Sequence, residues 1–338
     1  MKILKILAVL VLSFVLLVVV LIGLLFYVMA KMPAVPTNYT EKVETGGVLE
    51  AKYIKQGSYG VECMTAPLSE EWGNLIVHYP KELSSSEKKY PVVLLMNGTG
   101  VPASKYPALF THLASWGFVV LGNEDPSTCT GASADSTLAF IIRENEEAES
   151  PFYQKIDLEN IGIAGHSQGG AGVFNAITRY ERSGLYKTAV ALSPTHESVA
   201  KQIPGFEYDV TKVKVPLMLV AGDTGDFETK MVIPLEELVA MYERLSVPKV
   251  MMRRKGSEHG QTLYVADGYV TAWLMWHLQH DEEAANAFVG EKPELIHNSL
   301  YSDWRIDYPW LNKWSLNIQA YLMTDAEVLI CERSRENA

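Results

Sequence analysis

The sequence predicts an α/β protein built on a mostly parallel β-sheet with helices on both faces. Residues 92–96 form a short run that is apolar without a break, which is typical of a strand buried on both sides in a parallel sheet. Residues 104–116 then carry leucine, phenylalanine and tryptophan at helical spacing, and this alternation of strand and helix patterns continues along the chain. In residues 161–172 a strand, a tight glycine-rich turn and a helix follow one another directly, which joins both patterns in one unit.

The same patterns place the remaining elements in order. We expect strands at residues 48–53, 75–79, 92–96, 118–121, 161–164, 188–192, 217–220 and 250–253. We expect helices at residues 104–116, 132–145, 171–180, 233–245 and 270–280. About 20 residues separate the strand at 188–192 from the next strand, too few for an independent cap domain, so the site should be open.

Length and composition bound the class of protein. The chain has 338 residues, which fits one large α/β domain, and 48% of them are hydrophobic. The net charge is −11 at pH 7. An acidic chain repels phosphate backbones, so we expect no nucleic-acid partner.

Residues 1–31 are predicted to form a transmembrane helix that acts as an N-terminal signal anchor. Lys2 and Lys5 precede residues 6–30, which carry no charge. At 1.5 Å per residue that run gives about 37 Å of helix, enough to cross a bilayer core with some tilt. The basic end should stay in the cytoplasm, which places the rest of the chain on the extracytoplasmic side of the cell membrane. The alternative is a signal peptide cleaved after the small residues of 28–30, which would leave a secreted protein.

Two further boundaries follow the anchor. Residues 32–45 contain Pro33 and Pro36 and show no periodicity, which predicts a linker between membrane and domain. One α/β domain should then occupy residues 46–338, with a C-terminal extension from about residue 292.

The three cysteines, Cys63, Cys129 and Cys331, match neither a zinc site nor a redox C-x-x-C pair. Outside the cytoplasm a disulfide between Cys63 and Cys129 is possible, and three free thiols are the alternative. No spaced set of histidine and acidic residues indicates a metal site, and nothing in the sequence calls for a cofactor.

The turn at residues 165–169 reads G-H-S-Q-G and has the form of a nucleophile elbow. Such a turn holds its serine, here Ser167, in a strained conformation at the tip between strand and helix. The glycines on either side let strand and helix pass closely.

A nucleophilic serine needs a base and an acid that orients the base, and both should follow strands downstream of the elbow. Asp223 and Asp226 follow the strand at 217–220, and His259 follows the strand at 250–253. The order serine, acid, histidine is the order that this architecture uses.

The motifs G-H-S-Q-G-G, G-D-T-G-D and S-E-H-G resemble those of the α/β-hydrolase superfamily, and over residues 90–289 the chain is similar to its dienelactone-hydrolase-like branch, which includes cutinase-like polyester hydrolases. The resemblance implies an α/β-hydrolase fold without a large cap, Ser167 as nucleophile and His259 as general base. In that family the acid lies three or four residues past the glycine that ends its strand, which favours Asp226 and leaves Asp223 as the alternative.

The resemblance also implies an oxyanion hole made of two backbone N–H groups. One belongs to Gln168, directly after the nucleophile, and the other to Thr99, in the loop after the strand at 92–96. The family often has His-Gly in this loop, whereas the chain has Asn97-Gly98.

The function expected from the sequence is therefore an extracytoplasmic serine esterase that cleaves a small or polymeric carboxylic ester through an acyl-enzyme. An envelope acyltransferase would use the same acyl-enzyme with another acceptor, and a peptidase would use it on amides. A binding module on an inactive hydrolase scaffold is the remaining class, and an intact set of serine, acid and histidine argues against it.

Overall fold

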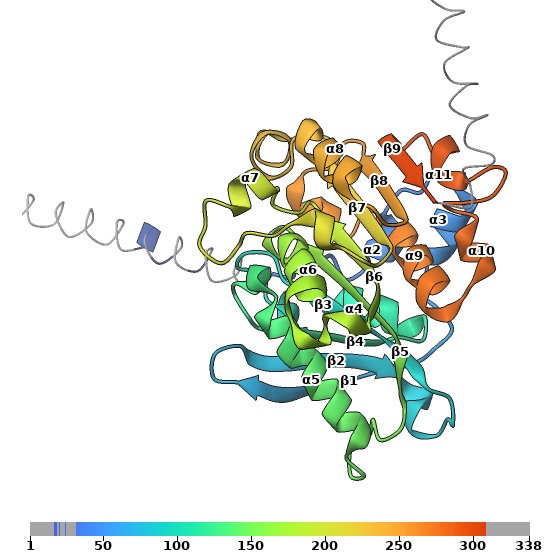
Figure 1. Ribbon diagram of the computed structural model, residues 1–338. Helices are drawn as coiled ribbons and strands as arrows, with labels where there is room; N and C mark the ends of the chain where they lie inside the picture. Colours follow the sequence, from blue (N-terminus) through green and yellow to red (C-terminus); the bar gives the residue numbers. More distant parts are fainter. Residues whose placement is uncertain (1–16, 19, 21–23, 25–31, 309–338) are drawn as a thin grey trace, which may run out of the picture.

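The computed structural model describes residues 17, 18, 20, 24 and 32–308, and within them the chain forms one nine-stranded sheet (Figure 1). The strand order is β1-β2-β4-β3-β5-β6-β7-β8-β9. The strands from β4 to β8 in this order are parallel, while β1, β2 and β9 run antiparallel to their neighbours. The strands are β1 (Val61–Ser69), β2 (Gly73–Pro80), β3 (Tyr90–Met96), β4 (Val119–Asn123), β5 (Ile156–His166), β6 (Tyr186–Leu192), β7 (Leu217–Gly222), β8 (Lys249–Arg254) and β9 (Tyr301–Asp307).

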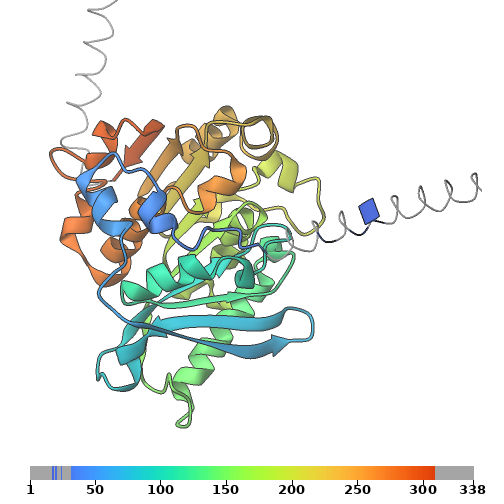
Figure 2. The same ribbon diagram turned by 180° about the vertical axis from the view of Figure 1, so that it is seen from behind.

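Helices cover both faces of this sheet, as the sequence predicts (Figures 1 and 2). One face is covered by α5 (Ala132–Glu146), α6 (Gln168–Arg179) and α8 (Leu235–Arg244). The other face is covered by α3 (Val48–Tyr53), α4 (Pro107–Ser115) and α9 (Asp267–Gln279). The remaining helices have four residues each: α2 (Tyr39–Lys42), α7 (Glu197–Ala200), α10 (Glu282–Ala285) and α11 (Glu294–His297).

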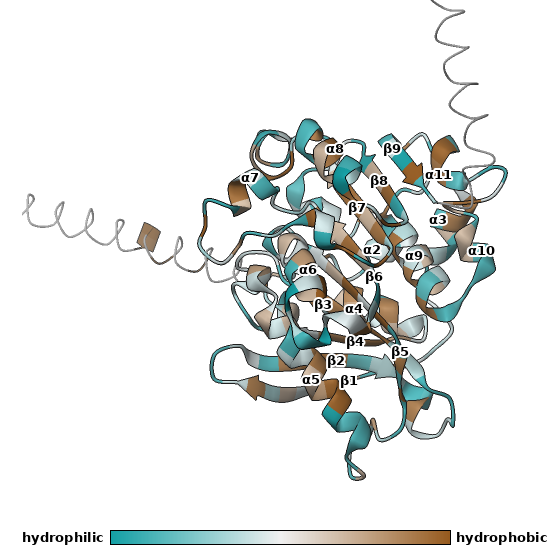
Figure 3. Cartoon of the chain, in the orientation of Figure 1, coloured by the Kyte–Doolittle hydropathy of each residue, from teal (hydrophilic) through white to brown (hydrophobic). Residues whose placement is uncertain are grey.

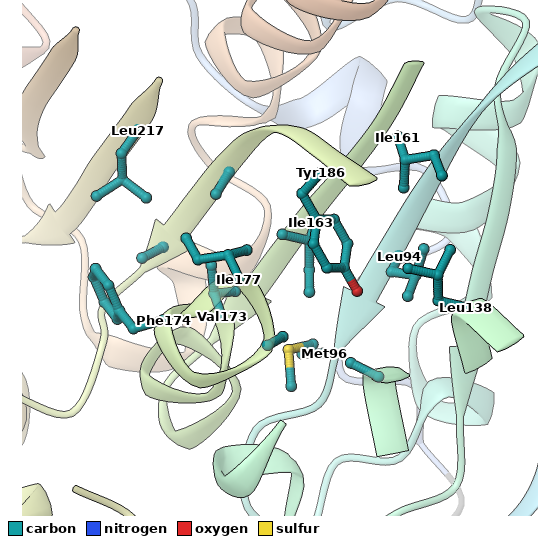
Figure 4. Close-up of a cluster of buried hydrophobic side chains, with 14 of the residues drawn as sticks. Leu94, Met96, Leu138, Ile161, Ile163, Val173, Phe174, Ile177, Tyr186 and Leu217 are labelled. Carbon is teal, nitrogen blue, oxygen red and sulfur yellow. The ribbon is translucent and has the colours of Figure 1, made fainter. Parts of the chain in front are cut away.

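The continuous apolar runs arise because the central strands are buried on both sides. In β3, Leu94 and Met96 belong to the cluster drawn in Figure 4, whereas Val93 and Leu95 face the opposite helical layer. Successive side chains of a strand point to opposite faces, so both sets must be apolar. The central strands accordingly stand out as apolar in Figure 3.

Residues 48–53 form helix α3 rather than the predicted strand. The N–H groups of Leu49 and Glu50 donate to the Glu294 carboxylate at 2.7 and 2.9 Å. A carboxylate at a helix N-terminus satisfies free N–H groups and complements the helix dipole. This partner lies more than 240 residues further along the chain, so the local pattern could not reveal it.

The predicted linker at residues 32–45 packs against the domain instead of spacing it from a membrane. Val35 and Tyr39 are buried in the core, and the Tyr39 hydroxyl donates to Asp267 at 2.6 Å. Two isolated side chains make these contacts, and they leave no periodic pattern in the sequence.

The predicted C-terminal extension from about residue 292 is also part of the domain as far as the structure describes it. Residues 301–307 form β9, which pairs with β8 and completes the sheet. The pairing hides the edge of β8, where unpaired backbone groups would otherwise be exposed.

The predicted N-terminal anchor and one of the three cysteines involve residues that the structure does not describe. The predicted anchor over residues 1–31 lies almost wholly outside the described residues, and no helix among the residues that are described has the length and hydropathy to cross a bilayer. Cys63 is an exposed free thiol on β1 and Cys129 a buried one, so the possible disulfide between them is absent. Cys331 also lies outside the described residues.

A buried polar cluster joins the N-terminal segment, through Tyr39, and α4, through His112, to Asp267 at the start of α9. His112 Nδ1 lies 2.6 Å from Asp267 Oδ2, with both side chains almost fully buried. His112 Nε2 lies 2.9 Å from the Lys55 carbonyl oxygen, which it can reach as a donor. Burial alone would lower the pKa of His112, but the Asp267 carboxylate and the carbonyls of Lys55 and Tyr53 outweigh it, so the pKa is raised.

This cluster predicts a pH-dependent stability. Since the folded pKa of His112 exceeds its ordinary value of 6.5, the ion pair contributes fully below pH 6.5 and loses its contribution as the pH rises through the folded pKa. Removing one partner of a buried pair costs about 3–5 kcal/mol. We expect His112→Gln to lower the melting temperature most at pH 5–6 and less at pH 9, measured by circular dichroism. A difference that grows with pH would contradict this assignment of charge.

Candidate active site

The loops at the carboxyl ends of β3, β5, β7 and β8 bring the chemically competent residues together. Ser167 is the single residue between β5 and α6, with φ of 61° and ψ of −123°. A Cβ on Gly165 would lie 2.3 Å from the Gly169 carbonyl oxygen, and one on Gly169 would lie 2.4 Å from that of Met96. Only glycine fits at either position. The backbone between β5 and α6 therefore has the tight turn that the sequence predicts.

Backbone hydrogen bonds hold the elbow against β6. The Ser167 N–H donates to the Leu192 carbonyl at 2.9 Å, and the Thr195 N–H donates to the Ser167 carbonyl at 3.2 Å. Gln168 is the first residue of α6, so its N–H has no acceptor within the helix. Its side chain is anchored elsewhere, because Nε2 donates to the Pro126 carbonyl at 2.6 Å.

His259 lies beside the serine, where the sequence predicts the base. It opens the 3₁₀ turn His259–Leu263 after β8, and its Nε2 lies 2.9 Å from Ser167 Oγ. The His259 side chain is 15% exposed, so substrate and water can reach the pair from one side.

The acid behind the histidine is Glu228. Its Oε2 lies 2.6 Å from His259 Nδ1, and its Oε1 accepts hydrogen bonds from Ser193 Oγ at 2.6 Å and from the Gly222 N–H at 2.7 Å. The carboxylate is fully buried. Burial alone would raise the pKa of Glu228, but the hydrogen bonds from His259, Ser193 and Gly222 outweigh it and hold the pKa below its ordinary value.

The prediction of Asp226 as the acid is therefore wrong, and so is the alternative, Asp223. The Asp226 side chain is 83% exposed and pairs with Lys230 at 2.8 Å. Asp223 accepts from the Gly256 N–H at 2.6 Å and so fixes the loop that leads to His259.

The turn after Asp226 explains why Glu228, and not Asp226, lies behind His259. Residues Phe227–Val232 form a π-helical turn directly after Asp226, and its wider coil carries the next carboxylate, Glu228, inward beneath the histidine. The longer glutamate side chain reaches Nδ1 from a position six residues past Gly222. The signal in the sequence was that glutamate is an accepted third member in this architecture, which makes every acid after β7 a candidate.

Two further residues hold the His259 main chain. His166 Nε2 lies 2.8 Å from the His259 carbonyl oxygen, and Thr262 Oγ1 donates to the same oxygen at 2.7 Å. Burial, aided by the neighbouring His259, lowers the pKa of His166 to about 4. His166 is thus neutral near pH 7, and its one N–H must sit on Nε2 to make this bond.

The loop after β3 approaches the serine from the other side. A Cβ on Gly98 would lie 3.5 Å from the Ser167 Cβ. The Val101 N–H donates to the Gly98 carbonyl at 3.1 Å, and Gly100 has φ of 69°, so Thr99 occupies the second position of a tight turn. Asn97, which departs from the family's usual histidine, is buried and donates to the carbonyls of Asn123 and Asp125. The Asn97 amide therefore braces this loop.

Residues 43–303 match the PET hydrolase-like family, described as PETase. The chain belongs to the PET hydrolase-like family. The matched span runs from before α3 into β9 and includes Ser167, Glu228 and His259, so the resemblance to α/β-hydrolases of the polyester hydrolase kind is confirmed. The nearer likeness to the dienelactone-hydrolase-like branch stays a prediction.

The chain is also similar to Chlorophyllase-1, chloroplastic, of Citrus unshiu. The two are 25% identical over 160 residues, which is 45% of this chain and 46% of the relative. The match therefore spans less than half the length of this relative.

The contrast between Glu228 and Asp226 gives a direct test. A fluorophosphonate probe labels a serine only when a base activates it. We expect Glu228→Gln to slow labelling of Ser167 by about 10⁴-fold, because an amide cannot hold the imidazole in the productive tautomer. Asp226→Asn should label at the wild-type rate, measured by mass spectrometry against time. Equal slowing by both variants would remove Glu228 from its place behind His259.

Proposed function

We propose that the chain is a carboxylic ester hydrolase that works through an acyl-enzyme on Ser167, His259 and Glu228. The observation that carries the proposal is the unbroken line from Ser167 Oγ through His259, at 2.9 and 2.6 Å, to a buried carboxylate. Membership of the PET hydrolase-like family supports an ester as the substrate. The similarity to a protein named as a chlorophyllase is a second, weaker support.

In the first step Ser167 Oγ attacks the carbonyl carbon of the ester while His259 Nε2 takes the hydroxyl proton. The resulting imidazolium then gives that proton to the leaving alcohol, and the acyl group stays on the serine. Water then attacks the acyl-enzyme while His259 Nε2 takes one of its protons, and His259 gives that proton to Ser167 Oγ as the acyl–oxygen bond breaks and the acid leaves.

Glu228 keeps its charge through this cycle. Its lowered pKa means that it stays ionised when His259 becomes an imidazolium, and it stabilises that cation through the Nδ1 hydrogen bond. Hydrogen bonds from Ser193 Oγ and the Gly222 N–H hold the Glu228 carboxylate in the position from which it contacts the His259 ring.

The tetrahedral oxyanion requires hydrogen-bond donors. The Gln168 N–H at the start of α6 is free of intrahelical partners, and Thr99 follows Gly98, on which a Cβ would lie 3.5 Å from the Ser167 Cβ. We assign these two N–H groups to the oxyanion hole.

The substrate is an ester whose carbonyl is accessible. Between β6 and β7 the chain forms only α7 and the 3₁₀ turn Val210–Lys212. Such short elements cannot build a cap, so the site suits esters at a surface or in a polymer as well as small ones.

We also propose that the domain lies on the extracytoplasmic side, held by residues 1–31. Lys2, Lys5 and the uncharged run at residues 6–30 support this orientation. Fractionation of expressing cells should leave the full-length chain in the membrane pellet and sensitive to protease added outside the cell. A soluble product in the medium that starts near Lys31 would exclude the anchor.

The activity itself is tested by the nucleophile. Ser167→Ala should reduce hydrolysis of p-nitrophenyl acetate by on the order of 10⁶-fold, since the whole acyl-enzyme route is lost. The release of p-nitrophenol is followed by absorbance, with melting temperature as the control for folding. Turnover by a folded Ser167→Ala protein at the wild-type rate would end the proposal.

The oxyanion assignment is tested by a change that removes one N–H and little else. Proline is favoured at the second position of a tight turn, so Thr99→Pro should leave the turn intact while deleting the Thr99 N–H. We expect kcat to fall by about 10²–10³-fold. Thr99→Ala keeps the N–H and serves as the matched control, with kcat within a few fold of wild type. Equal kcat values for the two variants would place the second donor elsewhere.

A further inference from the structure

We propose that the edge of the sheet that carries Ser167 docks on a zwitterionic lipid surface, from which the ester substrate enters the site. The proposal rests on the ester hydrolase function above and adds to it the physical state of the substrate. Two observations carry it: an exposed apolar pair beside His259, and the place at which the N-terminal segment joins the domain.

The apolar pair consists of Phe227 and Met231. Both belong to the π-helical turn Phe227–Val232, and they are 55% and 61% exposed. Glu228, between them, is 1% exposed. The turn that carries the buried acid inward therefore holds two large apolar side chains outward, each more than half exposed.

This pair is continuous with the reacting groups. The Phe227 ring stands edge-to-face with the His259 imidazole, with 5.0 Å between ring centroids and 86° between planes. A chain or ring of an ester bound at Ser167 can therefore extend onto Phe227 and Met231 without crossing water.

The second observation concerns the start of the folded body. The Ala34 N–H donates to the Lys105 carbonyl at 2.7 Å, just past the turn that holds Thr99. The Tyr39 ring packs on Tyr264, directly after the 3₁₀ turn that holds His259, with 5.9 Å between centroids. Residues 34–39 therefore pass beside two of the loops that build the site.

The residues that precede this segment are mostly apolar. The uncharged run at residues 6–30 is followed by Lys31 and then by Met32, which is 59% exposed. Whatever surface receives this run of 25 uncharged, mostly apolar residues is thus presented to the same edge of the sheet as Ser167, and a bilayer is the surface that suits it. The net charge of −11 disfavours anionic lipid and favours a zwitterionic surface.

The test compares hydrolysis of a p-nitrophenyl ester in a bilayer with hydrolysis of one in water. The full-length chain is reconstituted in phosphatidylcholine vesicles and given p-nitrophenyl palmitate dissolved in the bilayer or p-nitrophenyl acetate in water. The quantity measured is the ratio of kcat/KM for the embedded ester to that for the soluble one. We expect Phe227→Ser with Met231→Ser to lower this ratio at least tenfold.

The matched control is Tyr153→Ser. Tyr153 is 38% exposed but precedes β5, at the opposite end of the strands, so its replacement should leave the ratio within twofold of wild type. If the double variant does not fold, as judged by its melting temperature, Met231→Gln alone must still lower the ratio at least threefold. Met231 is the more exposed of the two.

The possible results distinguish a failure of lipid docking from a failure of the proposed ester hydrolase function. An unchanged ratio in a folded double or single variant overturns lipid docking while leaving the hydrolase intact. A loss confined to particles of poly(ethylene terephthalate), with the vesicle ratio unchanged, also overturns it and assigns the pair to a polymer surface. A wild-type protein that cleaves neither ester refutes the proposed function itself.

Discussion

The structure of the site depends on one buried carboxylate. Glu228 is a buried carboxylate, and such a group is tolerated only when it is paired and hydrogen-bonded. Its partners come from three places: Ser193 after β6, Gly222 at the end of β7, and His259 after β8. By satisfying one carboxylate, the ends of three neighbouring strands are held in a fixed relation, and the ring of His259 is held with them.

The serine is joined to the same network through β6. The Ser167 N–H bonds to Leu192 and its carbonyl receives the Thr195 N–H, so Ser193 lies in a segment that touches both the elbow and the acid. His166 extends this connection by bonding to the main chain of His259. The reactive pair is therefore positioned by hydrogen bonds within the protein, behind which the Glu228 carboxylate is fully buried.

The sequence was sufficient for whatever depended on local pattern. The apolar run at residues 92–96 became β3, and the glycines at 165 and 169 placed Ser167 in its elbow, because each depends on neighbours in the chain. His259 was found because one histidine follows the right strand. Glu228 was missed because the π-helical turn after Asp226 changes which carboxylate faces inward, and no periodicity announces such a turn. Helix α3 and the packing of Tyr39 were missed because their partners, Glu294 and Asp267, come from the far end of the chain.

The burial of Val35 and Tyr39 has a consequence for the life of the protein in the cell. Within residues 32–308, the contacts that tie the N-terminal segment to the domain include those of Met32, Val35 and Tyr39. Peptidase cleavage after Ala30 would consequently sever the leader and leave the folded body whole, whereas removal of a dozen further residues would strip the core of an aromatic ring and leave Asp267 with one fewer donor.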